Sequence, residues 1–226
     1  MNAECFDSSS SDGSNNRVLL FDDMSIERIG IDFELQARES GYRNVAGVDE
    51  VGRGCLAGPV VAAACVLDID RPLPEGLDDS KKLSPAKREK IGAELKANCI
   101  AYAIGSVSAA EIDRINILEA TKEAMLLAIG SLDPPADHLL IDAILLKKSP
   151  LAQRSIIRGD SISASIAAAS ILAKTYRDAL MAAYDREFPQ YGFASHKGYG
   201  SAFHLDAIRT HGPCPLHRRT FRGVVV

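Results

Sequence analysis

Four acidic residues stand where apolar or small-residue segments begin or end, and their types and positions could support chemistry. Asp49 and Glu50 close one apolar segment, Asp142 closes another, and Asp160 stands at the start of a helical segment rich in Ala and Ser. A carboxylate in apolar surroundings is costly unless it is paired, protonated or bound to a cation. A divalent metal ion held by these acids removes that cost, and an all-oxygen ligand set favours Mg²⁺ or Mn²⁺ over zinc. Without an ion, burial and repulsion should raise the pKa of at least one carboxyl.

Each acid also has a simpler interpretation. An Asp at a helix start is most often an N-cap, which suits Asp160, and an Asp after a strand is most often a loop residue. Asp49 and Glu50 are neighbours and would point to opposite faces of a regular strand, so they need a distortion to serve one site, which Gly52 and Gly54 could supply. Two carboxylates beside a cleft would also suit the acid and base of a glycoside hydrolase. The acids alone leave both kinds of site open.

The pattern of apolar residues predicts strands that alternate with helices. Segments 45–51 and 59–67 are predicted as a hairpin of two strands, the second buried on both faces because it is continuously apolar. Strands that alternate with helices after such a hairpin indicate an α/β fold with a mixed sheet. The predicted helices are 24–40 with Ser25 as cap, 84–98 with Ser84 as cap, 111–132, 165–188 and 202–210, and the other predicted strands are 100–107, 139–141 and 155–157.

Composition indicates one globular unit without export or membrane signals. The chain is 46% hydrophobic and 25% charged, which at 226 residues implies a single sizeable core. Residues 1–24 are predicted as a disordered tail, because 1–16 are rich in Ser, Asp and Asn. The five cysteines include no C-x-x-C pair, which favours free thiols in a reducing compartment. No stretch resembles a membrane span or a signal peptide, so we expect a soluble cytoplasmic protein.

The net charge of −4 by itself argues mildly against a nucleic-acid partner. Residues 1–44 hold nine acids and four bases, whereas residues 45–226 hold 22 bases and 21 acids. Metal ions bound to the four acids would leave the rest of 45–226 distinctly basic. From Phe188 onward there is a single acid, Asp206, against five Lys or Arg. The sequence therefore predicts a basic surface beside an acidic metal site.

Motifs spread along the chain resemble those of one known family. The segment Val45-Ala-Gly-Val-Asp49-Glu50-Val-Gly52-Arg53-Gly54 resembles the opening of bacterial ribonuclease HII. Arg53 and the short stretch before the first strand favour that family over its sister, ribonuclease HIII. Further segments resemble the family in its order, namely Asp79-Ser-Lys-Lys-Leu-Ser84, Leu140-Ile-Asp142, Gly159-Asp160-Ser161, His196-Lys-Gly-Tyr199 and His217-Arg-Arg-Thr-Phe221.

The resemblance implies a ribonuclease H-like fold over residues 25–226, with a mixed five-stranded sheet flanked by helices and a C-terminal helical region. It implies an endonuclease that hydrolyses the RNA strand of RNA–DNA hybrids and nicks 5′ of single ribonucleotides in duplex DNA, leaving a 3′-hydroxyl and a 5′-phosphate. Two ions, Mn²⁺ or Mg²⁺, would be bound by Asp49, Glu50, Asp142 and Asp160. We expect a monomer with no membrane partner. The presence of all four acids argues against an inactive hybrid-binding module.

The same resemblance assigns residues that bind the substrate. The turn Gly52-Arg53-Gly54 takes the place of the loop that recognises the ribose 2′-hydroxyl, and glycines let the backbone come close to that group. Tyr199 takes the place of a tyrosine that packs against the sugar. Basic residues would hold phosphates without reading sequence, and Arg218 and Arg219 are among the candidates. The remaining predicted substrate-binding residues are Ser80, Lys81, Lys82, Lys174, His196, Lys197 and Gly198.

His211, Cys214 and His217 lie close together in the sequence, near two prolines. One cysteine with two histidines is a weak zinc signal. We interpret the three as loop residues, with His217 near phosphate.

Overall fold

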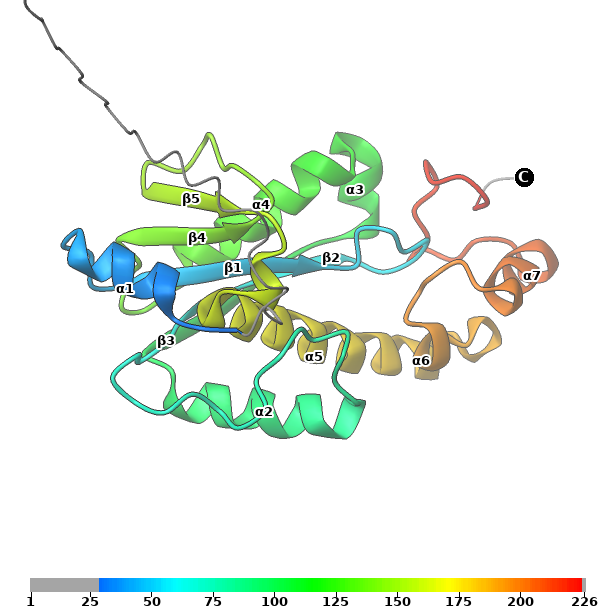
Figure 1. Ribbon diagram of the computed structural model, residues 1–226. Helices are drawn as coiled ribbons and strands as arrows, with labels where there is room; N and C mark the ends of the chain where they lie inside the picture. The colour runs from blue at the N-terminus through cyan, green and yellow to red at the C-terminus, as the bar shows by residue number, and fades with distance from the viewer. Residues whose placement is uncertain (1–28, 225–226) are drawn as a thin grey trace, which may run out of the picture.

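The computed structural model describes residues 29–224, so the predicted tail 1–24 and the predicted cap Ser25 lie outside the described residues. The strands are β1 (Val45–Val51), β2 (Val60–Val66), β3 (Ala101–Val107), β4 (His138–Asp142) and β5 (Ala152–Ile156). They form one sheet in the order β3-β2-β1-β4-β5 (Figure 1). β2 is antiparallel to β1 and to β3, whereas β4 runs parallel to β1 and β5 parallel to β4. The predicted hairpin and mixed sheet are confirmed.

Helices cover both faces of this sheet (Figure 1). Helix α4 (Ile117–Gly130) packs on one face and α5 (Ala164–Glu187) on the other, with α2 (Pro85–Asn98) against α5. Alternate residues of β2 enter the two cores, so that Ala62 packs on the α4 side and Ala63 on the α5 side. All seven residues of β2 are buried, as a continuously apolar strand requires.

Small residues bring α5 close to the sheet. A Cβ added to Gly47 of β1 would lie 2.0 Å from the carbonyl carbon of Ser165, in the first turn of α5. Ala63 of β2 and Ala168 of α5 belong to the same core. Because protein interiors are close-packed, such an approach leaves no room for a side chain at Gly47. The backbone of β1 therefore fixes where α5 begins.

The predicted helix 111–132 is wrong in one respect, because Asn116 divides it into α3 (Ala109–Ile115) and α4. Asn116 has a φ of 71°, a conformation in which an α-helix does not continue. Its side-chain oxygen accepts hydrogen bonds from the N–H groups of Leu118 at 3.0 Å and Glu119 at 3.1 Å, which caps α4. Asparagine is suited to both roles.

The first helix, α1 (Asp32–Glu39), is shorter than the predicted 24–40. Gly30 forms a parallel bridge with Ser163, and its carbonyl accepts the Ala164 N–H at 2.8 Å. The chain before Asp32 is thus bound to the segment that leads into α5 instead of continuing the helix.

Short helices follow α5 and form the predicted C-terminal helical region. They are η2 (Pro189–Tyr191), α6 (Phe193–His196) and α7 (Ala202–His211), and they surround a separate small core with Met181 of α5. In Figure 1, α6 and α7 lie at the end of α5, beyond one edge of the sheet. A 3₁₀ turn, η1 (Gly159–Ser161), precedes α5. No helix within 29–224 is long and apolar enough to span a membrane.

Candidate active site

Two of the four acids end neighbouring parallel strands. Val48 of β1 pairs with Ile141 of β4, so Asp49 and Asp142, the next residue of each strand, stand side by side at one edge of the sheet. Asp142 Oδ1 accepts a hydrogen bond from the Gly159 N–H at 2.8 Å. This bond holds η1, and with it the next acid, against the end of β4.

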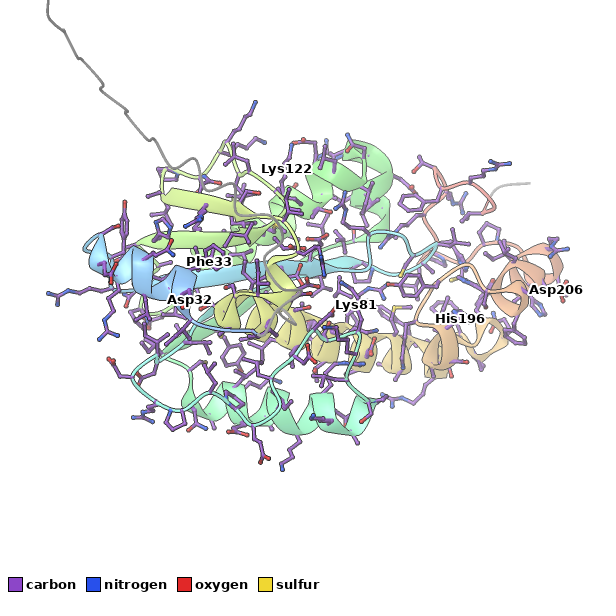
Figure 2. The ribbon with its side chains drawn as sticks, viewed as in Figure 1. Asp32, Phe33, Lys81, Lys122, His196 and Asp206 are labelled. Atoms are coloured by element: carbon purple, nitrogen blue, oxygen red, sulfur yellow. The ribbon has the colours of Figure 1, made fainter. Side chains whose placement is uncertain are left out.

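That next acid, Asp160, is paired with a lysine. Asp160 is 5% exposed, and its Oδ2 accepts a hydrogen bond from Lys81 Nζ at 2.9 Å. Figure 2 shows Lys81 in the middle of the molecule, in the loop that precedes α2. Burial acts to lower the pKa of Lys81, but the hydrogen bond and charge of Asp160 outweigh it, and the pKa is raised. Lys81 thus neutralises one acid of the site.

Asp49 is 3% exposed, which makes it the most buried of the four acids. Its pKa is well above the ordinary value, first because of burial and then because of the negative charges of Glu50 and Asp142. Hydrogen bonds from the Glu50 N–H at 2.7 Å and from the Ser170 hydroxyl oppose the shift without reversing it. The Ser170 hydroxyl also bonds that of Ser80 at 2.9 Å. The metal-free site therefore holds a proton more tightly than a free carboxyl would.

Glu50 lies in a regular stretch of β1, without the strand distortion that the sequence suggests. The pairing of β1 with β2 continues regularly through Glu50 opposite Ala62, so Asp49 and Glu50 leave the strand on opposite faces. Arg53 Nη1 donates to Glu50 Oε1 at 3.3 Å, while Oε2 is buried without a partner among the described residues. Burial raises the pKa of Glu50, and Arg53 offsets this only in part. The expected distortion is wrong; Glu50 contributes its charge from the other face at the strand end.

The chemistry of the four acids fits a divalent metal ion. Within 29–224, no group of three or more His, Cys, Asp and Glu side chains is already close enough to hold one. The pKa of Asp142 is nevertheless also raised, chiefly by burial, and one buried oxygen of Glu50 is unpartnered among the described residues, so Lys81 and Arg53 do not offset the burial of all four acids. Carboxylate oxygens are the ligands that Mg²⁺ and Mn²⁺ prefer.

The predicted recognition turn follows directly after these acids. Gly52 has a φ of 93° and is buried, whereas Arg53 and Gly54 are exposed. A Cβ on Gly52 would lie 2.3 Å from Nε of Arg177, so this position requires glycine. The N–H of Leu56, further along the same loop, donates to the carbonyl of Gly198 at 2.8 Å. The loop after β1 and the turn before Tyr199 are thus joined.

Comparison with known proteins identifies the family. A family model described as Ribonuclease HII matches residues 46–224. The chain belongs to the ribonuclease HII family. The Ribonuclease HII of Syntrophotalea carbinolica is 56% identical over 192 residues, which cover 85% of this chain and 91% of that protein. That of Geobacter sulfurreducens is 55% identical over 193 residues, covering 85% and 88%.

Membership of the ribonuclease HII family settles the class of enzyme. The chain is a ribonuclease H-type endonuclease, from a family that acts on RNA–DNA hybrids and depends on divalent metal ions. The crystal structure of ribonuclease H2 from Pyrococcus horikoshii OT3 superposes with a TM-score of 0.68 at 29% identity, covering 80% of this chain and 95% of that one. The predicted fold is confirmed, and the glycoside hydrolase alternative is wrong.

The lysines that the ribonuclease HII motifs assign to phosphate differ in exposure. Lys82 is exposed and lies 3.3 Å from Asp78, whereas Lys174 of α5 is largely covered and bonds Asp178 at 2.6 Å. Lys197 is partly buried, and its carbonyl accepts a hydrogen bond from Arg177. Their contacts with phosphate stay predictions.

Ser80 and His196 are engaged inside the protein. Ser80 is 3% exposed and bonded to Ser170. His196, which Figure 2 shows towards α7, has Nδ1 accepting the Gly198 N–H at 3.2 Å and Nε2 at 2.6 Å from the Tyr191 carbonyl oxygen. Ser80 therefore bonds the serine that bonds Asp49, and His196 holds the turn at Gly198. Tyr199, in contrast, is 45% exposed and available to a substrate.

The predicted phosphate contacts of Arg218 and His217 are wrong, because both side chains are buried, at 0% and 2% exposed. His217 Nδ1 accepts the Cys214 N–H at 3.0 Å, and its Nε2 lies 3.0 Å from Nε2 of His204. The guanidinium of Arg218 donates to three backbone carbonyls and lies over the Phe221 ring, 5.0 Å from its centroid. His211 is also not a loop residue, since it ends α7.

Glu34 and Arg177 are buried charged residues that the sequence does not predict to be buried. Glu34 of α1 is 1% exposed and accepts hydrogen bonds from Ser163 Oγ at 2.7 Å and the Ser165 N–H at 2.9 Å, which anchors the start of α5. Arg177 is fully buried in α5. Its spacing from the buried Met181, four residues on, is a signal that it lies on the inward face of the helix.

Proposed function

We propose that this chain hydrolyses the RNA strand of RNA–DNA hybrids and nicks duplex DNA 5′ of a single ribonucleotide, using Mg²⁺ or Mn²⁺ and leaving a 3′-hydroxyl and a 5′-phosphate. One observation carries the proposal: Asp49 and Asp142, both with raised pKa values, end neighbouring parallel strands directly before the turn that holds the exposed Arg53 and Gly54. Family membership supports the broader activity of a ribonuclease H endonuclease.

In the proposed mechanism, Asp49, Glu50, Asp142 and Asp160 would hold two divalent ions, whose chemistry would be to lower the pKa of the attacking water and stabilise the 3′ oxygen that leaves. Asp49 would be the central ligand, because the charges of both Glu50 and Asp142 act on it. Asp160 is assigned to the more weakly held ion, because Lys81 already engages its Oδ2.

The protein's own groups orient these ligands. The Gly159 N–H holds Asp142, and the Glu50 N–H holds Asp49. Lys81 Nζ holds the Asp160 carboxylate through an ion pair at 2.9 Å. Such fixed donors reduce the reorganisation that the site must undergo during the reaction.

Selection of the ribonucleotide is assigned to the turn Gly52-Arg53-Gly54 together with Tyr199. The 2′-hydroxyl is the group that distinguishes RNA from DNA, and an exposed glycine turn lets backbone groups reach it. Arg53 and Gly54 are exposed and lie beside Glu50, so a bound sugar would stand next to the acids. The exposed ring of Tyr199 would pack against that sugar.

A nicking assay tests the proposal. A DNA duplex with one ribonucleotide should be cut once, on its 5′ side, in the presence of Mg²⁺ or Mn²⁺, and a chelator should stop the reaction. A matched all-DNA duplex is the control and should stay intact. Equal cutting of both duplexes, or cutting that persists with excess chelator, would contradict it.

A further inference from the structure

Two fully buried arginines bind the two loops that carry the proposed recognition groups. The guanidinium of Arg218 donates to the carbonyl oxygens of Gly52 at 2.7 Å, Arg53 at 2.8 Å and Gly58 at 3.0 Å. Gly52 and Arg53 belong to the recognition turn itself. Their carbonyls therefore point inward, toward Arg218, while the Arg53 side chain points to solvent.

Arg177 makes the complementary set of bonds from α5. It donates to the carbonyl oxygens of Pro59 at 3.0 Å, Ala57 at 3.1 Å and Lys197 at 2.8 Å. The first two lie in the loop after β1, and Lys197 lies two residues before Tyr199. One guanidinium thus spans both loops.

The contacts around these two arginines leave little freedom. A Cβ on Gly52 would meet Arg177 at 2.3 Å, and a Cβ on Gly198 would meet the Ala57 carbonyl oxygen at 2.5 Å. No ion pair between described residues includes Arg177 or Arg218, and each guanidinium donates to three backbone carbonyls. A charge buried away from water is costly unless it is hydrogen-bonded. Hydrogen bonds from a charged guanidinium to carbonyl oxygens are stronger than those between neutral groups.

We propose that Arg177 and Arg218 are positioning residues, which hold the Gly52-Arg53-Gly54 turn and the Tyr199 turn at one fixed separation, so that the 2′-hydroxyl and the sugar of a ribonucleotide are engaged together. This inference rests on the proposed function of the two turns. Neither arginine touches the substrate, because both are 0% exposed.

The planar fork of arginine is essential to this role. Each guanidinium reaches three carbonyls in fixed directions, whereas a lysine ammonium keeps the charge but is a point donor on a flexible stem. Arg218→Lys and Arg177→Lys therefore remove the geometry and preserve the charge. A displacement of about 1 Å at a reacting group can cost on the order of 100-fold in rate.

The test is a single-turnover nicking assay at saturating enzyme, on a duplex with one ribonucleotide. We expect Arg218→Lys and Arg177→Lys to lower the rate constant about 10- to 100-fold, with duplex affinity within about threefold because both arginines are buried and neither contacts a phosphate. Partial unfolding changes the amount of active enzyme rather than this rate constant, so the readout separates positioning from stability. Arg186→Lys and Arg209→Lys, at exposed arginines of α5 and α7, are matched controls and should cut at the wild-type rate.

Two further measurements keep the inference open to refutation. Because both arginines hold the same loop, the double variant should lose about as much rate as the worse single variant, rather than the product of the two losses. In the wild-type protein, amides of residues 55–58 should exchange with solvent slowly, since the loop is clamped. Wild-type rates in both lysine variants, or fast exchange of this loop, would overturn the inference. Equal cutting of the ribonucleotide-containing duplex and the all-DNA duplex by the wild-type enzyme would instead overturn the proposed function.

Discussion

Substitution of Gly47 by alanine should disturb both stability and the candidate active site. The added Cβ would lie 2.0, 2.2 and 2.3 Å from three backbone atoms of Ser165 and Ile166, where no side-chain rotation can relieve the clash. Ordinary contact distances are 3.5–4.0 Å or so. The first turn of α5 must therefore move by more than about 1 Å, or β1 must bend away from it.

The size of the effect follows from this geometry. Overpacking a core costs about 1–3 kcal/mol, and a clash with backbone belongs at or above the upper end. For a chain of this size, about 3 kcal/mol corresponds to a fall of roughly 6–12 °C in the unfolding midpoint. Asp160 lies four residues before α5, so its distance from Asp49 changes too, and a shift of about 1 Å predicts a loss of cleavage near 100-fold.

Thermal unfolding and single-turnover nicking measure the two effects on the same samples. Gly130→Ala is the matched control, because nothing lies within 4 Å of an added Cβ there. It should leave cleavage unchanged and leave stability equal or slightly higher. If Gly47→Ala unfolds and cleaves like the wild-type protein, the account of how β1 positions α5 is wrong.

Three other predictions concern the ionisable groups. Asp142→Asn should bring cleavage below detection while duplex affinity stays within about threefold. Its unfolding midpoint should not fall, because the raised pKa of Asp142 means that folding disfavours the negative charge of this carboxylate. A variant that still cleaves would refute the assignment. Because the pKa values of Asp49, Glu50 and Asp142 are raised, the metal-free protein loses stability as pH rises from about 4 through those values. Mg²⁺ binds the ionised carboxylates, so it should raise the unfolding midpoint more at pH 8 than at pH 5. Equal shifts at the two pH values would contradict this prediction. The pKa of His217 is lowered to about 4, chiefly by burial. Its contribution to stability is therefore present above pH 6.5 and lost as pH falls toward 4, by at most about 3 kcal/mol. His217→Gln should flatten that acid-side loss in a urea titration at pH 7 and pH 5, and an unchanged slope would show that His217 is not its source.

Local signals in the sequence are sufficient to predict most of the strands and helices of the fold. The apolar run that ends at Val51 matches β1 at both ends, and Ser84 caps α2 by accepting the Lys87 N–H at 3.3 Å, as its position before Pro85 predicts. These features depend on neighbours in the chain. Asn116 shows the limit: its helical neighbours favour one long helix, and only its own positive φ divides it.

The parts of the site that sequence reasoning misses depend on contacts between distant segments. Arg218 is 166 residues from Gly52, whose carbonyl it binds, and an arginine in a polar C-terminal segment is ordinarily a surface residue. Glu34 binds Ser163, 129 residues away. No local sequence pattern predicts that the charged side chains of Arg218 and Glu34 are buried. Asp49, Glu50 and Asp142 each close an apolar segment and Asp160 precedes a helical one, so their places in the fold are predictable from neighbouring residues, whereas the contacts that orient them are not.

The thin layer of small residues between α5 and the sheet sets the length of acid that the site can use. Asp49 faces α5 next to Ala63, with Ala168 in the same core, so the helix backbone lies within reach of a short side chain. Larger residues there would widen the layer and leave an aspartate short of its partners. Glu50 is the single long acid of the four, and it is also the one that leaves β1 on the opposite face. Its additional methylene gives the Glu50 carboxylate a longer reach from that face than an aspartate at the same position would have.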